Sequence, residues 1–296
     1  MMVDLCQPGL PGAELPLDRV CALLAVNRGS HYRDSAGLRP TASAGLAELR
    51  RRKLVEVIEE IVLACPGYGY RRVTAQLHRE GWEVNHKLVL KLMRQESLLC
   101  RLRRRWVRTT DSEHGLRVYP NLLADRGWRS LTAMNQAWMA DITYIRLPQG
   151  FAYLAALLDG YSRKVVGWQV GRDVDAKLVL AALEQALERR RPEPGWIHHS
   201  DRGVQYACRD YVTRLERAGA RVSMTATGTP RENAQAERFF RTLKHEEVYL
   251  NDYQTYRQAE QSLGRFIEDV YNAKRLHSAL GYRPPDEFEA LTGGPS

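Results

Sequence analysis

The sequence predicts an α/β fold preceded by a small all-α region, and two observations support this prediction. Residues 138–170 contain three strand-like segments joined by short turns, which is typical of an antiparallel meander. Residues 175–240 then alternate between helical and strand-like patterns, which is typical of a sheet with flanking helices. This order of elements is the one expected for a ribonuclease-H-like fold, in which helices cover a mixed sheet.

The predicted elements of this region are bounded by turn-forming residues. In chain order they are strands 138–147, 151–159 and 163–170, helix 175–190, strand 196–200, helix 205–218, strand 221–224, a helix that carries Glu237, and a long final helix 253–273. Short turns at 148–150 and 160–162 join the first three strands. We expect Asp159, Ser162 and Arg163 to fix the second of these turns rather than to take part in catalysis.

The chain before the sheet is predicted to be helical. Residues 47–64 place apolar side chains at helical spacing, and two short amphipathic helices follow over 71–80 and 86–96. Short helices, tight turns and a basic outer face favour a helix-turn-helix unit, with a small helical bundle as the alternative. The expected regions are an N-terminal helical segment with a linker (1–46), a basic helix-turn-helix region (47–106), a second linker (107–130) and a ribonuclease-H-like core with a C-terminal helical tail (131–296).

The net charge of +9 is concentrated in one segment of the chain. Residues 51–110 hold 14 Lys and Arg against 6 Asp and Glu, whereas the rest of the chain is nearly neutral. A concentrated positive charge indicates a polyanionic partner, because Lys and Arg that neutralise phosphates release condensed counterions; a merely solvated basic face is the alternative. The candidate DNA-binding residues are Arg71, Arg72, Lys87, Lys91, Arg94, Arg101, Arg103, Arg104 and Arg105.

Composition and cysteine usage argue against several classes of protein. The chain is 44% hydrophobic and 27% charged, and it lacks the roughly 18–20 consecutive apolar residues that a membrane span needs. Its five cysteines are scattered, which fits neither a disulfide framework nor a zinc site. The first residues lack the basic-then-apolar pattern of a signal peptide. We therefore expect a protein of the reducing cytoplasm.

Three carboxylates stand in distinctive settings within the predicted core. Asp141 interrupts an apolar strand, where a carboxylate is costly unless it meets a metal or a partner. Asp201 follows the C-terminal end of a strand, where ligands of α/β sheets collect, and Glu237 lies on the polar stripe of an amphipathic helix. Carboxylates from three separate elements can hold two divalent cations, which is the minimal apparatus for cutting and rejoining phosphodiester bonds.

Each of these carboxylates also has an ordinary structural interpretation. Asp141 could lie at a solvated sheet edge, Asp201 could cap the helix that follows it, and Glu237 could form an exposed pair with Arg241. The order and settings of the three carboxylates together favour the metal site over these alternatives.

Other polar residues near these motifs are secondary candidates. Four of them could orient a metal ligand or contact a phosphate: His199, Asn233, Arg241 and Lys244. The alternative for each is a purely structural hydrogen bond. Arg275 and His277 would contact DNA or pack the last helix.

The motifs around these residues carry a family resemblance. They are Tyr68-Gly69-Tyr70-Arg71-Arg72, Trp138-x-x-Asp141-Ile-Thr143-Tyr144, His199-Ser-Asp201-Arg-Gly203-x-Gln205-Tyr206, Asn233-Ala-x-x-Glu237-x-Phe239-Phe240 and Tyr271-Asn272-x-x-Arg275-x-His277-x-x-Leu280-Gly281-Tyr282. In this order they resemble the second-reading-frame (OrfB) transposases of the IS-three family of bacterial insertion sequences, whose cores resemble retroviral integrases. The resemblance covers nearly the whole chain.

The resemblance implies a DNA transposase with an integrase catalytic core. Asp141, Asp201 and Glu237 would form a DDE triad that binds two Mg²⁺ or Mn²⁺ ions. The implied reaction is cleavage at the ends of the element, followed by attack of the exposed 3′-hydroxyl on another phosphodiester. The implied partners are double-stranded DNA of the terminal repeats and the target, further copies of the chain in a synaptic multimer, and an upstream-frame (OrfA-type) protein or fusion. The implied location is the bacterial cytoplasm, on the nucleoid when bound to DNA.

Two other functions are compatible with the same residues. One is a DNA-binding regulatory protein with an inactive core, although the presence of all three carboxylates argues against a decayed site. The other is a structure-specific nuclease of the same fold, which would cut DNA without joining it.

The third motif departs from the family pattern at Glu232, where the family commonly has Asp. The negative charge is kept, on a side chain that is longer by one methylene group.

Overall fold

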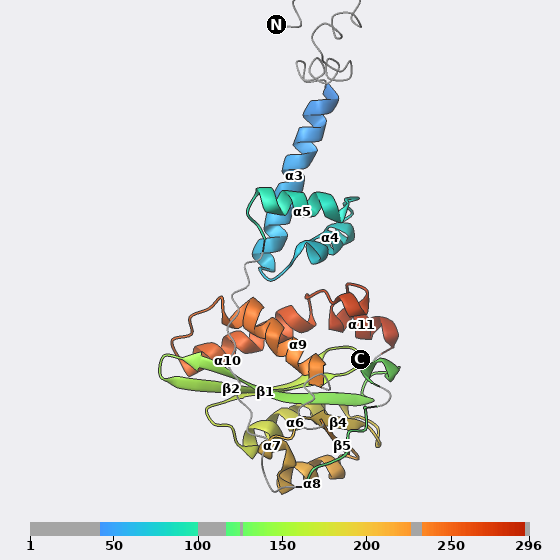
Figure 1. Ribbon diagram of the computed structural model, residues 1–296, viewed down its shortest axis with the longest axis vertical. Coiled ribbons are helices and arrows are strands. Elements are labelled where there is room, and N and C mark those ends of the chain that lie inside the picture. The colour runs from blue at the N-terminus through green and yellow to red at the C-terminus, as the bar shows by residue number, and fades with distance from the viewer. Residues whose placement is uncertain (1–41, 100–116, 125–126, 226–232, 294–296) are drawn as a thin grey trace, which may run out of the picture. The chain divides into compact units, whose positions relative to one another are not determined.

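The computed structural model describes residues 42–99, 117–124, 127–225 and 233–293 (Figure 1). The chain divides into two units, residues 1–59 and 60–296. Helix α3 (Ala42–Ala64) begins within the first unit, earlier than the predicted start at residue 47. Residues 42–46 are therefore helical rather than part of a linker, because Ala and Leu favour a helix here and a single Gly is tolerated. Residues 1–41 of the predicted N-terminal segment lie outside the described residues.

Two short helices follow close to their predicted positions, α4 (Tyr70–Arg79) and α5 (His86–Gln95). Their buried residues are Val73, Thr74 and Leu77 in α4 and Val89, Leu92 and Met93 in α5. Gly81 turns the chain after α4 with a φ of +85°, a conformation that glycine adopts without strain. The side chain of Asn85 then caps α5 by accepting a hydrogen bond from the Lys87 amide at 2.8 Å.

A five-stranded mixed sheet forms the centre of the core. Its strands are β1 (Ala137–Leu147), β2 (Gly150–Asp159), β3 (Val165–Gly171), β4 (Ile197–Ser200) and β5 (Arg221–Met224). The strand order is β3-β2-β1-β4-β5, with antiparallel β1–β2 and β2–β3 pairs and parallel β1–β4 and β4–β5 pairs. The predicted meander and mixed sheet are confirmed, and β1 is the central strand.

Helices cover both faces of this sheet (Figure 1). On one face lie α6 (Ala176–Arg190), α7 (Val204–Ala207) and α8 (Arg209–Arg217), and on the other lie α9 (Ala234–Leu243) and α10 (Tyr256–Arg265). Successive residues of β1 face opposite layers, because side chains alternate along a strand. Trp138 and Ala140 pack in the layer of α6, and Met139 packs in the layer of α9.

Two predicted helices differ from the structure in their course. The helix predicted over 205–218 is interrupted at Cys208, whose backbone is extended (φ −68°, ψ 147°), so that α7 and α8 are separate. The predicted final helix begins at Tyr256, where Thr255 caps it, and continues beyond Arg265 as a π-helix.

The remaining elements are the 3₁₀-helices η2 (Trp128–Ser130) and η6 (Ser278–Leu280), the π-helices η4 (Lys244–Val248) and η5 (Phe266–Asn272), and helix α11 (Pro285–Thr292). Within the described ranges, every helix is too short or too polar to cross a membrane.

A buried ion cluster joins α6 to α11. Arg190 donates two hydrogen bonds to the Glu289 carboxylate, at 2.8 and 2.6 Å, and each of the two side chains is only 7% exposed. The Ser162 hydroxyl donates to the same carboxylate at 2.6 Å, and Asp159 accepts a hydrogen bond from the Ser162 amide at 2.8 Å. Asp159 and Ser162 therefore fix the turn between β2 and β3, and the C-terminal helix is fastened to that turn.

We expect Arg190→Ala to lower the free energy of unfolding by about 3–5 kcal/mol, because Glu289 would lose its principal charge partner while remaining buried. The matched control is Arg189→Ala. Arg189 pairs with Glu268 at 2.8 Å but is 42% exposed, so its loss should cost at most about 1 kcal/mol. Urea unfolding of the purified variants measures both values. Equal losses would contradict the distinction between the buried and the exposed pair.

Candidate active site

Asp141 lies within β1, and Asp201 directly follows the end of the neighbouring strand β4. β1 and β4 run parallel, with Trp138 opposite His198 and Met139 opposite His199. Asp141 and Asp201 each come two residues further along the chain. Because side chains alternate between the faces of a strand, Asp141 lies on the face that carries Met139, and the electrostatic effect of Asp201 on Asp141 shows that Asp201 lies nearby. Two carboxylates that are distant in the sequence are thus brought together by the strand register.

Each of the two carboxylates also accepts a local backbone hydrogen bond. Asp141 Oδ1 accepts from the Ile142 amide at 2.8 Å, and Asp201 Oδ1 accepts from the Gly203 amide at 2.9 Å. A Cβ atom at Gly203 would lie 2.9 Å from Asp201 Oδ1, so a larger residue here would displace this carboxylate. Helix α7 begins directly after Gly203, two residues beyond Asp201.

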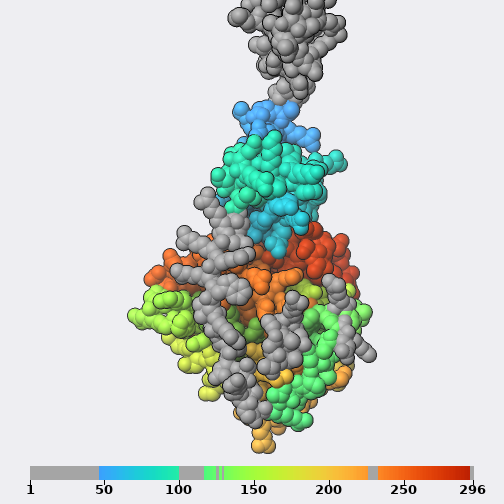
Figure 2. Space-filling view, viewed as in Figure 1, coloured from blue at the N-terminus to red at the C-terminus, as the bar shows by residue number. Residues whose placement is uncertain are grey.

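The third carboxylate, Glu237, lies in the first turn of α9. Four apolar residues of this helix pack against the sheet: Ala236, Phe239, Phe240 and Leu243. Glu237 lies next to this stripe and is half-buried. In the space-filling view, the orange surface of α9 and the residues after it borders the green surface of the β1 region (Figure 2).

The pKa values indicate that the three carboxylates interact. Burial raises the pKa of Asp141 well above its ordinary value, the negative charge of Asp201 raises it further, and Glu237 adds a smaller effect. Burial also raises the pKa of Glu237, which the positive charge of Arg241 opposes. Negative charge is therefore concentrated at this point, although in the described part of the chain no three His, Cys, Asp or Glu side chains are grouped closely enough to hold a metal ion together.

Lys244 is the nearest positive side chain to Asp141 that affects its pKa. It follows α9 directly, and its Nζ atom lies 4.6 Å from the centroid of the Tyr144 ring, within cation–π range. Burial lowers the pKa of Lys244, and the charge of Asp141 opposes that effect. The structure thus places Lys244 beside the carboxylates, whereas Arg241 is exposed on the outer side of α9.

The two other secondary candidates are buried in supporting positions. His199 Nδ1 lies 2.9 Å from the Ser223 hydroxyl, and the His199 ring packs edge-on against Trp128. Asn233 precedes α9, and its Nδ2 atom donates to the Ala140 carbonyl at 3.4 Å. These contacts make both residues structural supports of the strands that carry Asp141 and Asp201.

Tyr206 is a neighbour of the site to which the sequence motifs assigned no role. It is 2% exposed, and burial raises the pKa of its hydroxyl, with smaller contributions from Tyr211, Asp141 and Asp201. It therefore lies within electrostatic range of both carboxylates. Its place in the motif around Asp201 was the only signal in the sequence, and that signal does not distinguish packing from function.

Comparison with known proteins places the chain in a family. Two models described as integrase core domain match residues 132–230 and 218–285, and a model described as HTH-like domain matches residues 48–106. The transposase for insertion sequence element IS904 of Lactococcus lactis subsp. lactis (strain IL1403) is 36% identical over 82% of this chain and 95% of its own length. Transposase InsF for insertion sequence IS3A of Escherichia coli (strain K12) is 33% identical over 94% of this chain and 95% of its own length.

The chain belongs to the IS-three family of insertion-sequence transposases. Among solved structures, the catalytic core domain of BIV integrase matches with 21% identity and a TM-score of 0.42, covering 53% of this chain and 95% of that domain. The matches to the integrase core models and to the two transposases confirm the family resemblance of the sequence motifs and the enzyme class, and together with the five-stranded mixed sheet they confirm the ribonuclease-H-like fold.

The predicted DNA-binding residues of this transposase differ in accessibility. The exposed ones among the described residues are Arg71, Lys87, Lys91 and Arg94. Arg72 is half-buried, since its Nε atom donates to the Leu276 carbonyl at 3.1 Å and its Nη1 atom lies 3.9 Å from Glu246. The four arginines at 101 and 103–105 lie outside the described residues.

We expect Asp141→Asn to raise the free energy of unfolding by about 1–4 kcal/mol at pH 7 without divalent cations, because it removes a partly buried charge beside Asp201. The folded-state pKa of Asp141 is raised, so its charge disfavours the folded state above the unfolded pKa, and the gain should vanish below about pH 4. Thermal and urea unfolding in EDTA between pH 3 and 8 measures this effect. The matched control is Asp175→Asn at the exposed N-cap of α6, where Asn caps equally well and stability should not change. A loss of stability in Asp141→Asn would contradict the prediction.

Proposed function

We propose that this transposase cuts DNA at the ends of its insertion sequence and joins the exposed 3′-hydroxyl to target DNA, with Asp141, Asp201 and Glu237 as its metal-binding catalytic carboxylates. The main support is the β1–β4 register, which brings the chain segments of Asp141 and Asp201 together so that Asp201 and Glu237 both act electrostatically on Asp141.

The chemistry of these residues fits a divalent cation. Mg²⁺ and Mn²⁺ prefer carboxylate oxygens, and three carboxylates, those of Asp141, Asp201 and Glu237, interact here. Two bound ions would lower the pKa of an attacking water or 3′-hydroxyl and stabilise the leaving oxygen. Asp141 in β1, Asp201 directly after β4 and Glu237 in the first turn of α9 would hold them.

Other residues would bind and orient the DNA. Lys244 lies beside Asp141, where a phosphate that approached the carboxylates would meet its positive charge. The aromatic face of Tyr144 holds the Lys244 ammonium group in this position. His199 and Asn233 would keep the two strand ends in place through their buried contacts.

The basic helices supply a second DNA contact in this proposal. Arg71, Lys87, Lys91 and Arg94 are exposed on α4 and α5, in the region that matches an HTH-like domain. They would bind the phosphates of double-stranded DNA at the terminal repeats. Bringing two element ends together would require more than one copy of the chain, and an upstream-frame protein or fusion would assist end recognition.

We expect purified transposase to join pre-cut element ends to target DNA in Mg²⁺ or Mn²⁺, and Glu237→Gln to reduce joining by at least about 100-fold, since even supporting residues of metal sites contribute 10–100-fold. Asp141→Asn and Asp201→Asn should have the same effect. Strand transfer measured on gels with a labelled 3′-end tests all three variants. The matched control is Glu216→Gln, which changes an exposed glutamate of α8 and should keep wild-type joining.

The outcomes separate this proposal from its rivals. Cutting without joining by the wild type would favour a structure-specific nuclease of the same fold. Specific end binding with neither cutting nor joining would favour a DNA-binding protein or a requirement for the upstream-frame partner, and repeating the assay with the fused form distinguishes these two. Equal joining by wild type and Glu237→Gln would remove Glu237 from the catalytic set.

We expect the double variant Lys87→Gln with Lys91→Gln to lower the slope of log affinity against log salt concentration by about 2, because each lost phosphate contact removes about 0.9. Fluorescence anisotropy with labelled end DNA in EDTA measures the slope between 50 and 200 mM salt. The matched control replaces Arg209 and Arg217, two exposed arginines of α8, by Gln. It changes the net charge equally and should leave the slope unaltered. The same change of slope in both double variants would refute a specific DNA-binding role for α5.

A further inference from the structure

The turn before α4 contacts the C-terminal tail of the core within the second unit. The Tyr68 hydroxyl oxygen accepts a hydrogen bond from the Leu276 amide at 2.8 Å, and Arg72 Nε donates to the Leu276 carbonyl at 3.1 Å. Tyr68 is only 2% exposed. Both polar groups of the Leu276 backbone are therefore satisfied by side chains of the HTH-like region.

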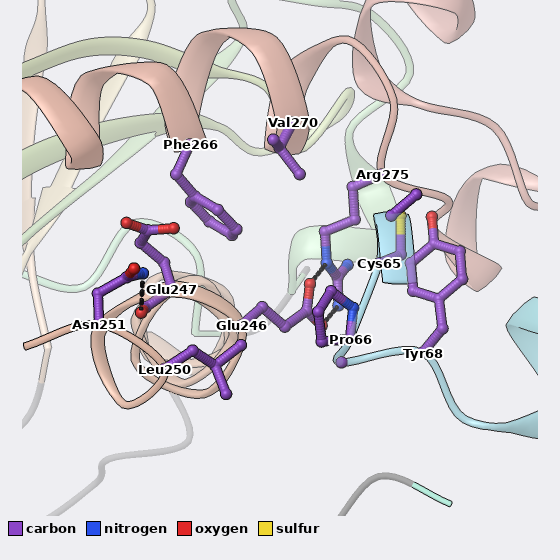
Figure 3. A pocket seen from close by; sticks show the side chains of 12 residues that line it. Cys65, Pro66, Tyr68, Glu246, Glu247, Leu250, Asn251, Phe266, Val270 and Arg275 are labelled. Carbon is purple, nitrogen blue, oxygen red and sulfur yellow. Dashed lines mark hydrogen bonds and ion pairs between the residues drawn. The ribbon is translucent and has the colours of Figure 1, made fainter. Parts of the chain in front are cut away.

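A buried ion pair lies beside this contact. Arg275 donates from Nε to Glu246 Oε2 at 2.7 Å and from Nη2 to Oε1 at 2.8 Å, and the two side chains are 4% and 10% exposed. Figure 3 shows the pair next to Cys65, Pro66 and Tyr68. A two-bond arginine–carboxylate pair fixes direction as well as distance, so Glu246 is held in one orientation.

Gly67 packs directly against the Glu246 side chain. A Cβ atom at Gly67 would overlap Glu246 Cγ and would lie 2.6 Å from its Cδ. Gly67 does not have a positive φ, so close packing and not backbone conformation requires glycine here. Glu246 also lines a cavity of about 280 Å³, so a displaced side chain has space to move into (Figure 3). By contrast, a Cβ atom at Gly69 would have no neighbour within 4 Å.

Glu246 and Glu237 belong to one continuous helical segment. α9 ends at Leu243, and the π-helix η4 follows without a break and contains Glu246. At the start of α9, the hydrogen bond from Asn233 to the Ala140 carbonyl is long, at 3.4 Å. The short polar contacts of this segment lie in η4, at the opposite end from Glu237: the Glu246–Arg275 pair, and the Glu247 carboxylate, which accepts from the Ser262 hydroxyl at 2.6 Å.

We propose that Glu246 and Arg275 are positioning residues for Glu237, and that close packing of Gly67 against Glu246 connects the HTH-like region to the catalytic helix. The proposal rests on the proposed function in so far as Glu237 is a metal ligand. The Glu246–Arg275 pair anchors η4, the rigid helical segment carries this constraint to α9, and Glu237 is thereby aimed at Asp141 and Asp201. Movement of the turn at Gly67 would then move Glu237.

The test compares Gly67→Ala with the matched control Gly69→Ala, two identical changes in one turn. The first readout is amide hydrogen exchange of residues 234–243 in metal-free protein. We expect faster exchange in Gly67→Ala and wild-type exchange in Gly69→Ala. The second readout is the Mg²⁺ concentration for half-maximal joining, which we expect to rise about tenfold in Gly67→Ala, the lower end of the effect of supporting residues on metal affinity. Binding of end DNA in EDTA should be equal in both variants, because neither change touches an exposed basic residue.

Several outcomes would overturn the proposal. Identical exchange over residues 234–243 in the two variants would show that Gly67 does not constrain α9. Altered exchange with an unchanged Mg²⁺ requirement would show that the contact is structural only. If Gly67→Ala does not fold, Glu246→Gln takes its place, and wild-type exchange and Mg²⁺ dependence in that variant would equally refute the proposal. Absence of joining by the wild type would count against the proposed function, while the exchange comparison would still decide whether α9 is anchored at Glu246.

Discussion

The parallel pairing of β1 with β4 is the constraint on which the candidate site depends. The pairs Trp138–His198 and Met139–His199 align the two strands just before Asp141 and Asp201, and the charge of Asp201 acts on Asp141. Their repulsion and partial burial disfavour the charged state of Asp141, so the surrounding packing must hold the pair together. That packing comes from both faces of β1, through Trp138 on one side and Met139 on the other. A site in which like charges are held in place before a cation arrives needs little rearrangement to bind one.

Both faces of the sheet combine apolar packing with directed polar contacts. On the α6 face, Gly167 lets the helix approach so closely that a Cβ atom would lie 2.7 Å from that of Ala186, and the Gln185 side chain accepts a hydrogen bond from the Trp168 amide at 2.8 Å. The α9 face adds buried polar links to its apolar core, among them the bond from Tyr253 to Glu247. Apolar contact fixes a distance, whereas directed polar contacts also fix a rotation. Glu237, the carboxylate that comes from a helix, thus belongs to a helical segment whose rotation is fixed by polar contacts.

Local pattern was enough to predict most elements of this fold. The three hairpin strands, the amphipathic helices and the positions of the carboxylates follow from periodicity, turn residues and polar interruptions of apolar strands. The order of the strands in the sheet could not be predicted from local pattern, because no local pattern indicates that β4 pairs with β1. The break at Cys208 and the π-helical turns also lack a local signal, since they arise from packing.

The functions of charged residues were hardest to assign from sequence. Arg72 and Arg275 were candidates for DNA contact, yet both are engaged by Glu246. Opposite charges 29 positions apart, such as those of Glu246 and Arg275, carry no indication of which residue pairs with which. Only the folded chain brings the two together.

The segment that contains α9 is anchored at Glu246 by an ion pair and not by apolar packing alone, and this difference indicates what the anchor does. A buried ion pair is weak support for stability, since well-packed apolar side chains of similar volume often stabilise a fold as much or more. Apolar side chains would, however, permit several rotations of a short helix, and Glu237 would then face the strand carboxylates only part of the time. The two hydrogen bonds from Arg275 fix Glu246 in one orientation. The π-helical geometry of η4 then sets the rotation of α9 about its axis relative to Glu246. The pair is therefore better explained as a determinant of helix orientation than as a source of stability.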